Sequence, residues 1–290
     1  MLQISSHFPV NYPEGREEED RMSHTWDPDR YLAYADERGR PFVDLVGRID
    51  ADAPRVVVDL GCGPGNLTRL LKERWPDARV SGVDSSPEMI EAASAIEDVT
   101  WEVGDVRAWA TPDPLALRAP VDVLVSNATL QWIPEHLDLL PGLLDRVAPG
   151  GWFAFQVPGN FDEPSHTTRT ELASREPYAE HVRDARVPTS HEPADYARLL
   201  LDLGCEVDAW ETTYLHVLTG DDPVFAWVSG TGARPTLQAL PDDLRPLFEE
   251  EFKAALREAY PADAAGRVIL PFRRIFVVAR KPHAQPATTS

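Results

Sequence analysis

Hydrophobic residues recur along the chain with two alternating periods. Short apolar or β-branched runs predict five strands, at residues 55–60, 78–83, 99–103, 121–126 and 152–157. Between them, apolar residues at helical spacing predict helices at residues 66–75, 85–95 and 134–146, and an earlier helix is predicted at 30–46. Regular alternation of strand and helix predicts an α/β fold with a doubly wound, mostly parallel sheet.

After residue 157 the alternation breaks, and it then resumes. Further helices are predicted at residues 193–203, 223–229, 235–240 and 243–259. Two more strands, at 207–217 and 267–278, bring the expected sheet to seven. The irregular blocks 158–190 and 219–265 are interpreted as insertions that form a helical lid over the carboxyl edge of the sheet. In open α/β folds, ligands bind at that edge.

The two ends of the chain lack this pattern. Residues 1–21 are polar and punctuated by proline, which predicts a disordered leader, and residues 282–290 predict a flexible tail. The remaining residues, 22–281, are expected to form a single domain that carries both insertions. The first 21 residues have no basic start and no apolar centre, so they do not resemble a secretory signal.

Composition narrows the class of protein. The chain has 290 residues, 43% of them hydrophobic, and a net charge of −20. Such acidity argues against nucleic-acid partners and anionic membranes, and no apolar run reaches the ~20 residues of a membrane span. The only two cysteines, Cys62 and Cys205, predict no disulfide framework, and no metal site is expected. We therefore expect a cytoplasmic protein, and a monomer because no coiled-coil pattern or long apolar edge is visible.

The most informative motif follows the first predicted strand. It has the form D-x-G-x-G-x-G, from Asp59 through Gly61 and Gly63 to Gly65, and a helix begins just after it. A glycine-rich strand–helix turn offers free N–H groups to a ligand. The second strand is followed by Asp84, which could accept two hydrogen bonds from a ribose. The acid at position 59 would repel a pyrophosphate but suits a ligand that carries a positive charge.

This pattern resembles motif I of the class I S-adenosylmethionine-dependent methyltransferases, which have a Rossmann-like seven-stranded sheet. The resemblance implies that Asp105 and Val106 hold the adenine, although Asp105 could instead cap the helix at Arg107. It implies that Asn127 holds the methionine end of the cofactor and that Trp132 lines the site, although Trp132 could instead be a buried core residue. The cofactor residues so predicted are Trp26, Tyr31, Asp59, Gly61, Cys62, Gly63, Asn66, Asp84, Ser85, Met89, Asp105, Val106, Asn127, Ala128 and Trp132. For Trp26 and Tyr31 two interpretations stay open: an aromatic N-terminal helix could close over the cofactor, or it could only pack against the sheet.

A narrower resemblance covers residues 26 to about 281. Stretches in both halves are similar to the trans-aconitate 2-methyltransferases, among them residues 82–90, 127–132, 163–166, 231–235 and 272–280. The resemblance implies methyl transfer to a carboxylate of trans-aconitate or a related small polycarboxylate, giving a monomethyl ester. The chain departs from the family at Leu215, where a tyrosine is frequent, and at Arg273, where proline is frequent.

Charge and chemistry indicate which residues could bind the substrate that accepts the methyl group. A carboxylate is already ionised at neutral pH, so no general base, and hence no catalytic acid–base residue, is predicted. A polycarboxylate that approaches an acidic protein needs local arginines, which make forked contacts with carboxylates. The predicted substrate residues are Arg234, Arg274, Gln156, His166, Tyr214, His216 and Trp132. Ion pairs with other acids, or structural hydrogen bonds, are the alternatives for these side chains.

Other functions fit parts of the pattern. An O-methyltransferase for another acid or for a natural-product hydroxyl would share the cofactor motif, and a hydroxyl acceptor would make His166 or His216 important as a base. A dinucleotide dehydrogenase is disfavoured by Asp59 and by the lack of a third glycine inside the helix. A non-catalytic cofactor-binding protein is disfavoured by the intact Asp84, Asp105 and Asn127.

Overall fold

The computed structural model describes residues 39–111, 119–183, 185 and 187–283. The predicted leader and the aromatic residues Trp26 and Tyr31 lie outside this range. The strands are β1 (Val56–Leu60), β2 (Arg79–Asp84), β3 (Thr100–Val103), β4 (Val121–Asn127), β5 (Val147–Pro158), β6 (Glu206–Leu218) and β7 (Val268–Arg280). The helices are α2 (Arg40–Gly47), α3 (Thr68–Arg74), α4 (Pro87–Ala93), α5 (Val106–Ala110), α6 (His136–Asp145), α7 (Pro164–Ala173), α8 (Ala179–Val182), α9 (Pro193–Asp202), α10 (Pro223–Ser229), α11 (Arg234–Ala239) and α12 (Arg245–Ala259), with a 3-10 turn η1 (Leu130–Trp132).

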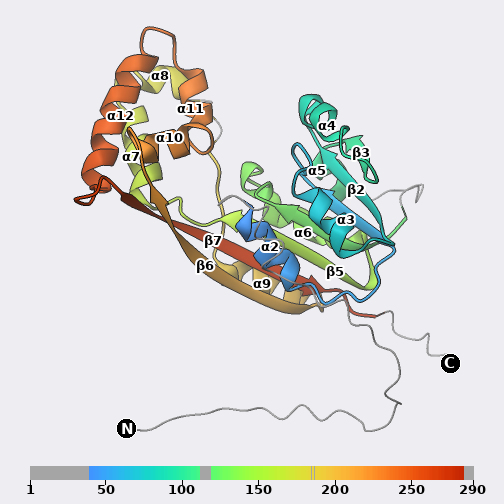
Figure 1. Ribbon diagram of the computed structural model, residues 1–290. Helices are drawn as coiled ribbons and strands as arrows, with labels where there is room; N and C mark the ends of the chain where they lie inside the picture. Colours follow the sequence, from blue (N-terminus) through green and yellow to red (C-terminus); the bar gives the residue numbers. More distant parts are fainter. Residues whose placement is uncertain (1–38, 112–118, 184, 186, 284–290) are drawn as a thin grey trace, which may run out of the picture.

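All seven strands form one sheet, in the order β3-β2-β1-β4-β5-β7-β6. Strands β1 to β5 are parallel, whereas β7 runs antiparallel to β5 and β6 antiparallel to β7 (Figure 1). The predicted mostly parallel α/β sheet is therefore confirmed. Because β1, β4 and β5 are neighbours and parallel, their carboxyl ends meet at one edge.

Apolar side chains cover both faces of the sheet. On one face, α2 and α3 pack through Phe42, Leu45 and Leu71. On the other, α5, α6 and α9 pack through residues such as Leu143 and Tyr196. Two buried layers explain why the sheet strands have almost continuous apolar runs.

Strand β5 is longer than the sequence predicted. Its expected start was Trp152, after a Pro-Gly-Gly turn, but the strand begins at Val147 and runs through that segment. Val121 of β4 pairs with Val147, and Val123 pairs with Trp152, so an irregularity in the ladder takes up the additional β5 residues. Proline and glycine here mark a bulge within a strand, not its boundary.

Five helices form a separate group beyond one end of the β6–β7 pair, and we call α7, α8, α10, α11 and α12 the distal helices (Figure 1). They come from the two blocks that were interpreted as insertions. Their own apolar cluster includes Leu172, Val228, Phe248 and Phe252, and it extends to Leu270 of β7. The long β6–β7 ribbon thus joins this group to the sheet.

The Trp101 side chain of β3 lies against two glycines. A Cβ atom at Gly82 of β2 would overlap the indole and would approach Cys62 Sγ at 3.0 Å, and a Cβ at Gly65 would also overlap the indole.

We expect Gly82→Ala to lower the free energy of unfolding by about 1–3 kcal/mol, because overpacking displaces the Trp101 ring. Gly230→Ala is the control, since no atom of the described residues lies within 4 Å of its Cβ position. Denaturant unfolding of the two variants measures this; equal stability losses would contradict the overlap.

Candidate functional site

The glycine-rich turn between β1 and α3 has one position open to a ligand. Gly61, Gly63 and Gly65 all have positive φ, of 84°, 56° and 79°. A Cβ at Gly61 would overlap Thr129, and one at Gly65 would overlap Trp101, so protein side chains occupy both spaces. Within the described part of the chain, nothing lies within 4 Å of the Cβ position of Gly63. The turn therefore offers bare backbone to a ligand at Gly63.

The carboxylate of Asp84 organises the neighbouring strand end. The Gly63 N–H donates to its Oδ2 at 2.9 Å, and the Ser86 N–H donates to its Oδ1 at 2.9 Å. Ser86 caps α4 by accepting a bond from Met89 N–H. Ser85 and Met89 are exposed beside this carboxylate, so β2 ends in an open polar surface next to the glycine turn.

Asp59, at the end of β1, is a buried carboxylate. The Thr68 hydroxyl of α3 donates to its Oδ2 at 2.6 Å. Burial raises the pKa of Asp59 to about 7, a shift that the Thr68 hydrogen bond opposes and Asp84 reinforces. A cation brought near it would favour the ionised form.

Cys62 lies between these acids and is not a nucleophile. Its buried Sγ faces Gly63 O at 3.5 Å. Burial, together with the charges of Asp59 and Asp84, raises the thiol pKa well above its ordinary value, so it stays neutral.

The turn after β4 holds a strained backbone beside β5. Ala128 has φ of 52°, a region that non-glycine residues rarely adopt. Its N–H donates to Gln156 O at 2.9 Å, and the Gln131 side-chain amide donates to Ala128 O at 2.5 Å. These bonds hold Asn127 at the sheet edge.

At the end of β3, Asp105 caps α5. Its Oδ1 accepts the Arg107 N–H at 2.7 Å, which is the structural role that the sequence left open. The side chain is exposed and Val106 is buried. The adenine role of both residues stays a prediction.

A cavity of about 690 Å³ lies between the sheet edge and the distal helices. Its sheet side includes Pro64, Asn66, Asn127, Ala128 and Trp132. Its other side includes His166, Thr231, Arg234, Phe272 and Arg274. Four predicted cofactor residues, Asn66, Asn127, Ala128 and Trp132, therefore share one cavity with the predicted substrate residues His166, Arg234 and Arg274. The other described cofactor residues, among them Asp59, Gly63 and Asp84, and the predicted substrate residue Gln156 are not among its described lining.

The arginines at this cavity differ in burial. Arg274 of β7 is buried, and its guanidinium carbon lies 4.3 Å from the centre of the Phe272 ring. Arg234, at the start of α11, is exposed. Arg169 was not predicted; it is buried, and it donates to Gly232 O in the loop that leads to Arg234. Arg169 therefore supports the loop from behind.

His166 of α7 is a buried neutral imidazole at the cavity. Its ring lies against Phe161, at 5.1 Å between centroids, and a Cβ at Gly232 would approach it at 2.6 Å. Burial, with a smaller contribution from Arg169, lowers its pKa to about 4. At neutral pH this imidazole is uncharged and holds protons weakly.

Around the cavity, several buried polar side-chain atoms have no hydrogen-bond partner among the residues that the structure describes. They are Asn127 Oδ1, Gln131 Oε1, both amide atoms of Gln156 and of Asn160, Ser165 Oγ and His166 Nδ1. Such groups are rare in proteins, and leaving one unpaired costs about 1–3 kcal/mol. Beside β4 the orphaned atoms are acceptors, whereas Gln156, Asn160 and Ser165 include donors. Of these residues, Asn127, Gln131 and His166 are in the described lining of the cavity, which can thus offer acceptors to a positive group beside β4. Gln156, Asn160 and Ser165 are buried outside that lining.

Two predicted substrate residues are engaged elsewhere. The Tyr214 hydroxyl of β6 donates to Asp44 Oδ2 at 2.5 Å, and the Arg40 guanidinium lies over the Tyr214 ring, so this side chain anchors α2. The His216 ring lies against Trp227, at 4.5 Å between ring centroids and tilted by 30°. Neither is among the described residues that line the cavity, although Trp227 is.

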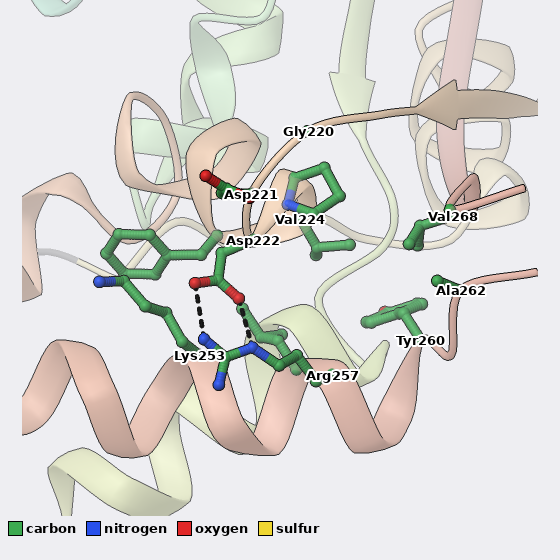
Figure 2. Close-up of a pocket in the computed structure, with 13 residues that line it drawn as sticks. Gly220, Asp221, Asp222, Val224, Lys253, Arg257, Tyr260, Ala262 and Val268 are labelled. Atoms are coloured by element: carbon green, nitrogen blue, oxygen red, sulfur yellow. Dashed lines mark hydrogen bonds and ion pairs between the residues drawn. The ribbon is translucent and has the colours of Figure 1, made fainter.

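A second cavity of about 630 Å³ lies on the distal helices, between the start of α10 and α12. Its described lining includes none of the predicted site residues. Within its lining, Arg257 binds Asp222 through bonds of 2.5 and 2.7 Å (Figure 2). The first cavity is therefore the candidate functional site.

Sequence reasoning missed Asn160, Gln131 and Arg169 as site residues. Gln131 stands in a stretch that carried the family resemblance, but a lone amide, there or at Asn160, gives no spacing signal. Arg169 occurs in a polar helix, where an exposed position is the usual expectation. Only the burial of Arg169 in the structure identifies it as a residue that supports the Arg234 loop.

The described residues fit a methionine-bearing nucleoside cofactor. Asp84 and the open Gly63 suit a ribose, while Asp59, Asn127 and Gln131 offer acceptors to a positive group. Within the described ranges, no cluster of three or more His, Cys, Asp or Glu could hold a metal ion. Nor does any described helix have the length and hydrophobicity to cross a membrane.

Comparisons with known proteins agree with this geometry. A family model described as a methyltransferase domain matches residues 31–210. Curated trans-aconitate 2-methyltransferases of Mycobacterium sp. (strain KMS) and Rhodococcus jostii (strain RHA1) are each 54% identical to this chain, over 258 and 260 residues. Each match covers 88% of this chain and 99% of the relative. The enzyme of the same name from Mycobacterium tuberculosis (strain ATCC 25177 / H37Ra) is 50% identical, over 88% of this chain and 96% of its own.

The fold has known counterparts at much lower identity. The crystal structure of the YcgJ protein from Bacillus subtilis superposes with a TM-score of 0.53 at 14% identity, covering 84% of this chain and 98% of that one. At such identity the likeness concerns the fold alone.

Asp59 should make stability depend on pH. Its folded pKa of about 7 lies above its ordinary value of 3.8, so its contribution is full below about pH 4 and is lost as pH rises through 7. We expect the stability of the ligand-free protein, relative to Asp59→Asn, to fall by roughly 3–4 kcal/mol between pH 4 and 7. Denaturant unfolding at several pH values measures the difference. A difference that is constant with pH would show that Asp59 ionises normally.

Proposed function

We propose, from the premise that this chain belongs to the trans-aconitate 2-methyltransferase family, that it transfers the methyl group of S-adenosylmethionine to a carboxylate of trans-aconitate, giving a monomethyl ester. The observation that carries the proposal is the 54% identity over 88% of the chain. A match of that length must include most of the distal helices, which form one side of the cavity. The similarity therefore extends to the region expected to select the substrate.

The cofactor would lie along the ends of β2, β1 and β4. Asp84 would accept the ribose hydroxyls, and Gly63 would allow close approach of the backbone. Asp59, with its pKa near 7, would be held ionised by the positive methionine ammonium, and Asn127 Oδ1 would accept a bond from the same end. Bound S-adenosylmethionine supplies a methyl carbon on a positive sulfur.

The acceptor would lie beside the ends of β5 and β7. Arg274 and Arg234 supply positive charge within an acidic protein, and Arg169 keeps the Arg234 loop in place. As a carboxylate oxygen bonds to the methyl carbon, the carbon–sulfur electron pair stays on sulfur, and no proton moves. The protein's contribution is then to orient and desolvate the oxygen, and orientation alone can supply roughly 7–11 kcal/mol. The distal helices would act as the lid that excludes water.

The state of His166 favours a carboxylate over a hydroxyl acceptor. A hydroxyl must lose its proton, and an efficient base has a pKa near the working pH. The pKa of His166 is about 4, which makes it a poor base at pH 7. A carboxylate needs no base, so the neutral imidazole can serve as a hydrogen-bonding wall.

Product analysis tests this function directly. The protein is incubated with methyl-labelled S-adenosylmethionine and a panel of trans-aconitate, other di- and tricarboxylates, and hydroxyl compounds. We expect base-labile label on trans-aconitate in preference to the other acids. Base-stable label on hydroxyl compounds alone, or tight cofactor binding without transfer to any acceptor, would overturn the proposal.

Arg234→Ala should weaken substrate binding specifically. The side chain is exposed at the cavity, so its loss should leave the fold and cofactor affinity unchanged. We expect KM for trans-aconitate to rise about tenfold or more, since a charged hydrogen bond contributes about 1.5–3 kcal/mol. Arg198→Ala is the control, because Arg198 pairs with Asp195 on the surface of α9. Equal KM values for the two variants would remove Arg234 from the site.

A further inference from the structure

The order of the strands sets the direction of methyl transfer. The proposed cofactor residues stand at the ends of β2, β1 and β4, and β5 and β7 follow in the sheet. Asn127 of β4 is paired in register with Gln156 of β5, so both side chains lie on the same face. Under the proposed function the methyl group would pass from the β4 side to the β5 side, and Gln156 lies at that boundary.

Gln156 combines complete burial with an unbonded amide. Its exposed fraction is 0%, and neither amide atom has a hydrogen-bond partner among the described residues. Its backbone carbonyl accepts the Ala128 N–H, which fixes its position against the β4 turn. Its neighbours on the same face, Asn127 across the ladder and Pro158 along the strand, both line the cavity. Gln156 itself is not among the described residues that line the cavity, but it lies on the same sheet face as two that do.

Positive charge lies further along the same face. Pro158 of β5 is paired with Arg274 of β7, two residues beyond Gln156 and about 7 Å along the strand. Asn160 follows Pro158, and its amide is also buried and has no partner in the described part of the chain. The neutral amides of Gln156 and Asn160 would therefore lie next to the bound S-adenosylmethionine. The positive charge of Arg274 lies about two residues further along the strand.

This separation has a chemical reason. During transfer, a negative carboxylate and a positive sulfonium both become neutral. A cation bound to the reacting oxygen would stabilise the reactants more than the transition state and would slow the reaction. A neutral amide orients the oxygen with a smaller penalty of this kind. Cations are useful only on carboxylates that do not react.

We propose that Gln156, with Asn160, donates to the reacting carboxylate, and that Arg274 and Arg234 bind the other carboxylates of the substrate. This rests on the proposed function and deepens it. The substrate class that follows is a small acid with at least two carboxylates, one held by neutral donors and another by arginine.

Gln156→Glu tests the proposal, because glutamate has the same shape and donates only when protonated. Trans-aconitate is titrated into the protein saturated with S-adenosylhomocysteine at pH 6 and pH 8, and the affinity is measured by calorimetry. A carboxyl at this fully buried position should have a raised pKa, as buried Asp59 does, so it would be largely protonated at pH 6 and ionised at pH 8. We expect the pH 6 to pH 8 affinity ratio of the variant to exceed that of the wild type by about tenfold or more, since the ionised side chain would repel the substrate carboxylate. Asn160→Asp should behave in the same way.

Gln238→Glu is the matched control, because Gln238 lines the same cavity from α11 but is exposed. Its affinity ratio should equal that of the wild type. If Gln156→Glu fails to fold, Gln156→Met decides: we expect a lower kcat with S-adenosylhomocysteine affinity retained. Wild-type pH ratios in both acidic variants, or an unchanged kcat in Gln156→Met, would overturn this inference alone. A wild type that esterifies no carboxylate would overturn the proposed function as well.

Discussion

Buried polar side chains at the carboxyl ends of β1, β4 and β5 are the constraint on which the site depends, and those at β4 and β5 include atoms without hydrogen-bond partners among the described residues. Protein folding ordinarily pairs such groups, because an unpaired one costs about 1–3 kcal/mol. Within the described residues, Asn127 Oδ1 and the amides of Gln156 and Asn160 lack partners, and Asp59 is buried enough to shift its pKa to about 7. The rest of the fold supplies enough apolar burial to support this cost. A ligand that carries opposite charges at its two ends would remove it.

Parallel strand order turns this constraint into a directional site. The ends of β2, β1, β4, β5 and β7 follow one another across the sheet. In the proposed function, a cationic methyl donor and an anionic acceptor would meet at the β4–β5 boundary. The β6–β7 ribbon then carries the distal helices out from the sheet, where they close the far side of the cavity (Figure 1). The reaction needs little more than orientation and removal of water, which accords with the scarcity of ionisable side chains suited to acid–base chemistry in the described lining of the cavity.

Much of the fold follows from local sequence signals. The apolar runs locate the strands to within one or two residues, except at β5, where Pro149 and Gly150 resemble a turn but lie inside a bulged strand. Asp84, Asp59 and Gly63 were predicted as cofactor residues because they stand at fixed distances from strand ends, and their cofactor role stays a prediction. Trp101 filling the spaces at Gly65 and Gly82, and the Tyr214–Asp44 bond, join residues far apart in sequence. Such contacts cannot be predicted from the spacing of residues in the sequence. This explains why Tyr214 was predicted to bind the substrate and why Asn160 was not predicted at the site.

The central claim is that sulfur and carboxylate meet at the β4–β5 boundary. A crystal structure of the protein with S-adenosylhomocysteine and trans-aconitate bound tests it most directly. The account predicts the ribose on Asp84, the sulfur beside Asn127, one carboxylate on Gln156 and another on Arg274. Trans-aconitate bound only in the second cavity near Arg257, or a sulfur atom directed away from β5, would contradict it.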